Sequence, residues 1–262
     1  MKKRLLVPMV LIIVALTAMS FAAGDGITLR LRPNKGKTYV IFSKTNQTTT
    51  MKVQGQTIRS TMNLDGRQNF SATDISSNQN VFETQIKALK MTSTTMGMTF
   101  TYDSDNPQNT SPMMAEQASM FDNIINKTNT VTYNELGHNT DANYEAMSQL
   151  GNVIVELPKE ELHVGSQWRF VKTQNVNDID VNINMTYTVT SISKKSVDVS
   201  YTGTVDSKDI TGNYEGTASI NPQTGIIMAN NISNTISMTI SEQGFDMPMT
   251  ISGTTTITVK EQ

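Results

Sequence analysis

The stretch VNINMTYTV, residues 181–189, decides the fold class of this chain. Its apolar side chains occupy every second position, at Val181, Ile183, Met185, Tyr187 and Val189. Successive side chains of a β-strand point to opposite faces, so this spacing is typical of a strand with one face on a core and the other in water. The pattern predicts a mainly β protein built from antiparallel sheet.

A second alternating segment, ISMTISEQGFDMPMTI (236–251), lies near the C-terminal end. Its apolar positions alternate up to Gln243-Gly244 and alternate again beyond it. We therefore expect a β-hairpin over residues 235–252 that turns near Gly244, with the pair Met247 and Met249 on one face. Pro248 would point away from that face and fits an edge or a bulge.

Two pairs of motifs indicate a weak internal repeat. KGKTYVIF (35–42) resembles VGSQWRFV (164–171), and FSATDIS (70–76) resembles YTVTSIS (187–193), with about twelve more residues between the motifs of the first copy. The repeat predicts two pseudo-repeated lobes, residues 23–105 and 155–262, or one large curved sheet or half-barrel. Chance similarity among threonine-rich strands is the alternative.

The aligned positions of the repeat predict structural roles. We expect Gly36 and Gly165 to form turns, because glycine adopts backbone conformations closed to other residues. Tyr39, Trp168 and Phe170 are expected to be buried anchors, since large aromatic side chains dominate the energetics of a core.

The composition changes between the lobes, over residues 106–154. Ser111 and Pro112 are typical of a helix start, and an apolar stripe follows at Met114, Ala118, Phe121 and Ile125. We expect a helical insert here, with a second short helix over 141–150. The first helix either plugs the core or borders a site for an apolar ligand.

The first 22 residues are expected to be an export signal. Lys2, Lys3 and Arg4 precede an apolar run that is short for a membrane span, and small residues lead to a cleavage site after Ala22. The interpretation places the mature chain in the periplasm or outside the cell without a transmembrane span; an uncleaved anchor is the alternative. The chain has no cysteine, so lipid attachment through cysteine is not expected.

The charge balance argues against nucleic acid as a partner. Removing the three cations of residues 2–4 leaves 18 Lys and Arg against 23 Asp and Glu, a net charge of about −5. A mildly acidic chain has no electrostatic attraction for phosphate backbones or anionic lipid.

No motif points to catalysis. The two histidines, His138 and His163, stand outside any GxSxG or HExxH frame, and there is neither a cysteine nucleophile nor a glycine-rich phosphate loop. We expect no catalytic residue, no cofactor and a non-enzymatic protein.

Methionines at alternate positions, Met96 and Met98 as well as Met247 and Met249, raise two hypotheses. Thioethers bind Cu(I), so the pairs could belong to a periplasmic copper-binding protein. Alternate positions on a strand also share one face, and Phe100 and Phe245 extend these faces. We favour core packing, with methionine as an adaptable filler and no metal site.

Four motifs occur in an order that resembles a known group of proteins: ITLRLRPNKGKTY (27–39), TFTYDSDNP (99–107), VELPKEELHVGSQW (155–168) and GTASINPQTGII (216–227). They resemble an uncharacterised family of exported bacterial envelope proteins, a β-rich domain of unknown function. The resemblance implies a β-rich exported domain and brings no catalytic or binding residue with it. A looser likeness, of fold alone, is to half-barrel lipoprotein carriers and periplasmic lipid-binding folds.

These observations together favour an envelope module that binds or scaffolds. Its partner would be an apolar small molecule such as a lipid, a hydrophobic peptide or another envelope protein, because a methionine-rich interior can repack around varied apolar guests.

Overall fold

The computed structural model describes residues 26–76, 79–141, 153–176, 179–242 and 245–262. These residues form eleven strands and three short helical segments. The strands are β1 (Thr38–Val53), β2 (Gln56–Ile75), β3 (Asn80–Thr95), β4 (Met98–Asp103), β5 (Thr128–Tyr133), β6 (Gln167–Val176), β7 (Ile179–Ile192), β8 (Val197–Asp206), β9 (Ile210–Ile220), β10 (Ile227–Glu242) and β11 (Phe245–Glu261). The helical segments are η1 (Pro107–Asn109), η2 (Pro112–Met114) and α1 (Ala115–Asp122).

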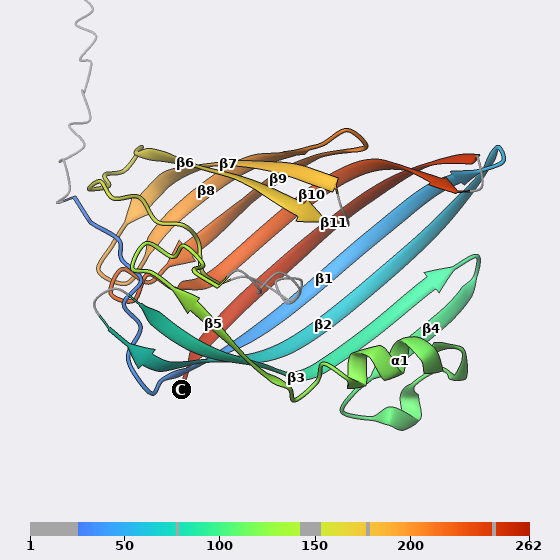
Figure 1. Cartoon of the computed structure of the whole chain (residues 1–262), viewed down its shortest axis with the longest axis horizontal. Coiled ribbons are helices and arrows are strands. Elements are labelled where there is room, and N and C mark those ends of the chain that lie inside the picture. Colours follow the sequence, from blue (N-terminus) through green and yellow to red (C-terminus); the bar gives the residue numbers. More distant parts are fainter. Residues whose placement is uncertain (1–25, 77–78, 142–152, 177–178, 243–244) are drawn as a thin grey trace, which may run out of the picture.

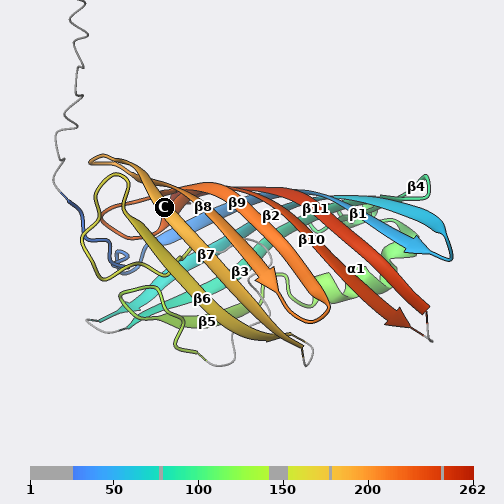
Figure 2. The same cartoon turned by 90° about the horizontal axis from the view of Figure 1, so that it is seen from above.

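All eleven strands belong to one antiparallel sheet. Its order is β4-β3-β2-β1-β11-β10-β9-β8-β7-β6, and β5 pairs with β3 beside this path. The sheet does not close, and it bends into an open half-barrel with a concave inner face (Figures 1 and 2). The prediction of a mainly β protein with a curved antiparallel sheet is confirmed.

The two expected lobes are halves of this one sheet. The first and last strands, β1 and β11, lie side by side in its middle, with Tyr39 opposite Glu261 and Met51 opposite Met249 (Figure 1). Backbone hydrogen bonding therefore runs without a break from residues of the first lobe to those of the second. The insert expected at 106–154 also contributes to the sheet, because it contains β5.

The internal repeat corresponds to equivalent hydrogen bonds at the start of two hairpins. The Gly36 N–H donates to the Ala72 carbonyl at 2.7 Å before β1–β2, and the Gly165 N–H donates to the Val189 carbonyl at 2.8 Å before β6–β7. Both glycines have positive φ, +81° and +89°, which a side chain disfavours. The first hairpin is longer, with strands of 16 and 20 residues against 10 and 14.

The main core fills one end of the half-barrel. There, residues 27–31 and 153–162 cross the concave side and bury Leu29, Leu31 and Val153 against the sheet. Each such aliphatic side chain contributes about 1.5–3 kcal/mol when fully buried.

A smaller cluster surrounds α1 toward the other end (Figure 1). The predicted stripe packs as expected at Met114 and Ala118, against Tyr102 and Leu89 of the sheet. The helix is shorter than its sequence pattern suggested. None of its described residues lines the pocket on the concave face of the sheet. The second expected helix and the export signal lie outside the described residues.

The interpretation that Met96 and Met98 point into the core is wrong. Met96 and Gly97 form the turn between β3 and β4, and Met96 has a φ of +51°. The Met96 side chain is 74 % exposed and that of Met98 is 52 % exposed. Alternation continued through the turn by coincidence, so the pair does not mark a buried face.

The second methionine pair shares one face of its strand, as predicted, but belongs to neither core cluster. Met247 and Met249 lie half-buried on the inner face of β11, and the hairpin pairs Met249 with Met238 of β10. Met51 of β1 lies opposite Met249 on the other side. Three methionines thus form a row across β1, β11 and β10.

Candidate binding pocket

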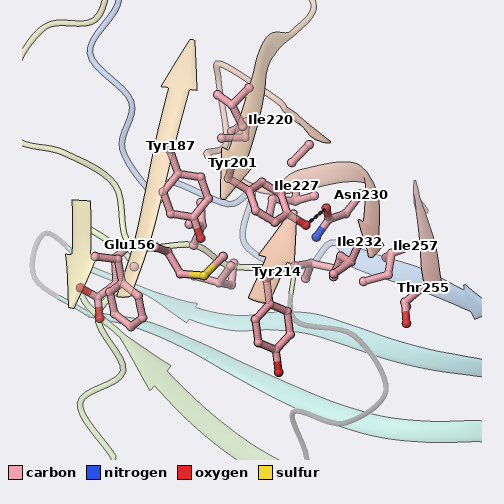
Figure 3. A pocket seen from close by; sticks show the side chains of 18 of the residues that line it. Glu156, Tyr187, Tyr201, Tyr214, Ile220, Ile227, Asn230, Ile232, Thr255 and Ile257 are labelled. Carbon is pink, nitrogen blue, oxygen red and sulfur yellow. Dashed lines mark hydrogen bonds between the residues drawn. The ribbon is translucent and has the colours of Figure 1, made fainter. Parts of the chain in front are cut away.

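The concave face holds a pocket of about 450 Å³. This volume falls within the range of small-molecule sites, about 300–1,000 Å³. One wall comes from β1 and β2, and the strands β6 to β11 supply most of the rest. Tyr133 of β5, Gly137, Asn139 and the segment 153–156 complete the lining. Its side chains are mostly aliphatic and aromatic. Figure 3 labels Tyr187, Tyr201, Tyr214, Ile220, Ile227, Ile232 and Ile257 among them. The lining also includes Ile41, Phe70, Phe170, Ile183 and Met185.

Small residues on the inner face of β8 and β9 explain why the sheet is hollow here. A Cβ atom at Gly216 would collide with the Tyr201 hydroxyl, and one at Gly203 would collide with the Met185 sulfur. The absent side chains let Tyr201 and Met185 lie flat along the sheet. Ala218, two residues after Gly216 on the same face of β9, has a small side chain and leaves further space in the pocket.

Three aromatic rings lie on neighbouring strands at one side of the site, and two of them, Tyr187 and Tyr201, line it. Trp168 of β6 stacks on Tyr187 of β7 at 4.9 Å between ring centroids, and Tyr187 contacts Tyr201 of β8 at 5.4 Å. The register places these residues directly opposite one another. The indole N–H of Trp168 donates to the Glu156 carbonyl at 3.0 Å, which fastens the 153–156 segment to the edge strand β6.

The polar groups inside the pocket are neutral. The Tyr201 hydroxyl donates to Asn230 Oδ1 at 2.7 Å, reaching over Gly216 to β10 (Figure 3). Burial raises the pKa of Tyr201 and of Tyr214, and burial beside the Glu156 carboxylate raises the pKa of Tyr187 to about 12. These hydroxyls therefore stay protonated at neutral pH.

Charge is confined to the rim. Of the described lining residues only Glu156 and Lys172 are charged, and Lys172 is exposed. The Glu156 carboxylate lies 2.7 Å from Nδ1 of His138. Within the described part of the chain, no group of three or more His, Cys, Asp or Glu is arranged to hold a metal ion.

The residues predicted to be structural anchors lie at different places relative to the pocket. Tyr39 is completely buried and Trp168 is 9 % exposed, while Phe170 is half-buried and lines the pocket. Gly36 and Gly165 lie in turns outside it. His163 is exposed, and His138 reaches the rim only through Glu156.

Sequence reasoning missed the polar residues of the pocket, Gln68 and Asn230. A signal for Gln68 existed: it falls on the apolar phase of β2, between Leu64 and Phe70, where alternation calls for an apolar side chain. A polar residue on the inner phase of a strand marks either a buried hydrogen bond or a binding site.

A comparison with protein-family models gives one match. Residues 140–227 match the family of unknown function DUF6263. The match confirms the resemblance to an uncharacterised, β-rich family. The DUF6263 region includes β6 to β9, which supply the aromatic side of the pocket and its small residues. No curated protein matches the chain.

Two solved structures align with most of this chain. Lipovitellin, in a structure concerned with its lipid–protein interactions, aligns with a TM-score of 0.53 at 10 % identity over 87 % of this chain. The alignment covers 26 % of the lipovitellin chain, so this chain spans about a quarter of that length. The translocator domain of the autotransporter NalP from Neisseria meningitidis aligns with a TM-score of 0.37 at 10 % identity, over 86 % of this chain and 90 % of that one. The likeness to lipovitellin concerns the fold alone.

None of the helices in the described residues is long and apolar enough to cross a membrane.

Proposed function

We propose that this protein is a non-enzymatic, exported binding module that holds an apolar ligand, such as a lipid or a hydrophobic peptide, in the concave pocket. The observation that carries the proposal is a 450 Å³ pocket lined by aliphatic and aromatic side chains with charge only at its rim. An apolar guest gains about 25 cal/mol for each Å² of apolar surface removed from water. The lipid–protein interactions of lipovitellin, a protein of similar fold, support this ligand class.

The proposal includes a location outside the cytoplasm. The apolar run of residues 5–19 after three cations supports export and cleavage near Ala22, and a chain without cysteine is compatible with an oxidising compartment.

A titration with the fluorescent apolar probe N-phenyl-1-naphthylamine tests the proposal. Ile232 is half-buried in the pocket wall, whereas its neighbour Asn231 is exposed on the outer face of the same strand. Ile232→Trp should fill the pocket and weaken probe binding at least tenfold, and Asn231→Trp should bind like the wild type. Equal binding by the two variants, or no binding by the wild type, would refute the proposal.

One observation favours Cu(I) binding as a second candidate function. Met51, Met249 and Met238 lie directly opposite one another on adjacent strands, where cross-strand Cβ atoms are about 4.5–5.5 Å apart. Their thioethers are suitable soft ligands for Cu(I). Uptake of Cu(I) under reducing conditions that disappears in Met238→Leu/Met249→Leu but persists in Met96→Leu/Met98→Leu would support this function; no uptake by the wild type would exclude it.

A further inference from the structure

The side chain of Gln68 has an unusual place in the pocket. Gln68 lies on the inner face of β2 and is only 5 % exposed, with Ile41 of β1 and Ile86 of β3 as its cross-strand neighbours. It lines the pocket, yet its amide forms no hydrogen bond with any described residue. Its amide is not among the fully buried polar atoms that lack a partner, so it keeps surface that water or a ligand in the pocket can reach. A polar side chain among apolar neighbours marks a binding site when a ligand takes the place of that water.

A second amide faces the same pocket from β10. Asn230 is 7 % exposed, and its Oδ1 accepts the Tyr201 hydroxyl. Its amide N–H groups donate to no acceptor among the described residues. Gln68 and Asn230 therefore present unused N–H donors inside an apolar cavity, and Gln68 also presents an unused acceptor.

The charge of the site restricts what these donors can bind. A carboxylate or phosphate buried beside Gln68 would find no buried cation among the described lining residues, because Lys172 is exposed and Glu156 is itself an anion. Burying an unpaired charge is far more costly than burying a neutral carbonyl that accepts a hydrogen bond. The pocket therefore favours an uncharged acceptor.

We propose that Gln68 is a specificity-determining residue that hydrogen-bonds the uncharged ester or amide linkage of an acyl ligand, so that the pocket selects acylated lipids over free fatty acids. The inference rests on the proposed function and defines its ligand class. Asn230 supplies a second donor, and the aliphatic and aromatic walls hold the acyl chain.

The test compares 1-palmitoylglycerol with palmitate, which have the same acyl chain, as competitors of N-phenyl-1-naphthylamine at pH 8. Wild-type protein should bind the ester at least tenfold more tightly than the carboxylate. Gln68→Leu should weaken ester binding about three- to tenfold, the usual value of one hydrogen bond, and leave palmitate binding unchanged. Without ligand its melting temperature should stay equal or rise, because an unpartnered polar group is removed.

Gln85→Leu is the matched control. The Gln85 amide donates to the Asn126 carbonyl outside the pocket, so this variant should lose stability and keep the ester preference. Gln68→Met, which keeps the length of the side chain, replaces Gln68→Leu if the latter does not fold. Equal binding of both competitors, or a Gln68 variant that loses stability but keeps ester binding, would overturn the inference while probe binding upholds the proposed function. Failure of the wild type to bind the probe would overturn both.

Discussion

Trp168 offers the most direct probe of how the half-barrel is held together. It lies on the edge strand β6, which has only β7 as a partner, and its ring is buried between Tyr187 and the 153–156 segment. Truncation to alanine removes the stacked ring and the hydrogen bond to the Glu156 carbonyl. We expect the free energy of unfolding to fall by about 3–5 kcal/mol, the usual cost of deleting a buried tryptophan.

The contributions can be separated with a second variant. Trp168→Phe keeps a ring for stacking, which is worth about 0.5–1.5 kcal/mol beyond burial, but loses the hydrogen bond, worth about 1 kcal/mol. We therefore expect Trp168→Phe to cost about 1–2 kcal/mol. Val171→Ala on the same strand is the control, because Val171 is exposed, and it should change stability by less than about 0.5 kcal/mol.

Urea denaturation followed by far-UV circular dichroism measures these values, since Trp168 is the sole tryptophan and its fluorescence is lost in the variants. A loss below about 1 kcal/mol for Trp168→Ala, with an unchanged dependence on urea, would show that the ring does not hold the edge strand and the 153–156 segment together.

The same structure makes three further predictions. Burial raises the pKa of Tyr187 from 10 to about 12, so the folded state retains this proton more strongly than the unfolded state. The free energy of unfolding should therefore be intact below pH 10 and fall as the pH rises toward 12. Urea titrations at several pH values should show a smaller fall for Tyr187→Phe. Met96→Ser/Met98→Ser should leave the urea midpoint nearly unchanged because both side chains are exposed, whereas a marked loss would mean that the β3–β4 turn is packed in solution. Gly216→Ala should displace the Tyr201 side chain from Asn230 and lower the melting temperature. The double variant Gly216→Ala/Tyr201→Ala should lose less or more stability than the sum of the two single variants, because residues in contact are coupled. Additive losses of stability would disprove the contact between Gly216 and Tyr201.

Much of the fold was predictable because local pattern and tertiary structure agree. The alternation in residues 181–189 matches β7, and the 236–251 pattern matches the β10–β11 hairpin with Met238 opposite Met249. Asp65 and Gly66 lie within one long strand, β2, which has a register shift at Arg67 and Gln68. Sequence periodicity specifies strands well, since it reports which face of each strand is buried.

The pairing of β1 with β11 was not predictable from such patterns. It joins residues 38–51 to residues 249–262, and alternation determines the face of a strand but not the identity of its neighbour. Alternation was also an unreliable guide at Met96, which was interpreted as an inward-facing strand residue. Its spacing from Met98 is that of a strand, and only Gly97, at a φ of +81°, signalled the turn between them.

The candidate site was the least predictable part, because its lining residues come from nine strands that are distributed along the sequence. Tyr187 was recognised as an inward residue, but its stacking between Trp168 and Tyr201 depends on register across three strands. The free amide of Gln68 becomes meaningful only once Ile41 and Ile86 are seen beside it.

If the concave pocket holds an acyl ligand, native mass spectrometry of the protein, purified without detergent, should detect that ligand on the folded chain. We expect an excess mass equal to an acylated lipid on the wild type and on Asn231→Trp, and no excess mass on Ile232→Trp. An unliganded mass for all three proteins, or the same bound mass on all three, would contradict this expectation.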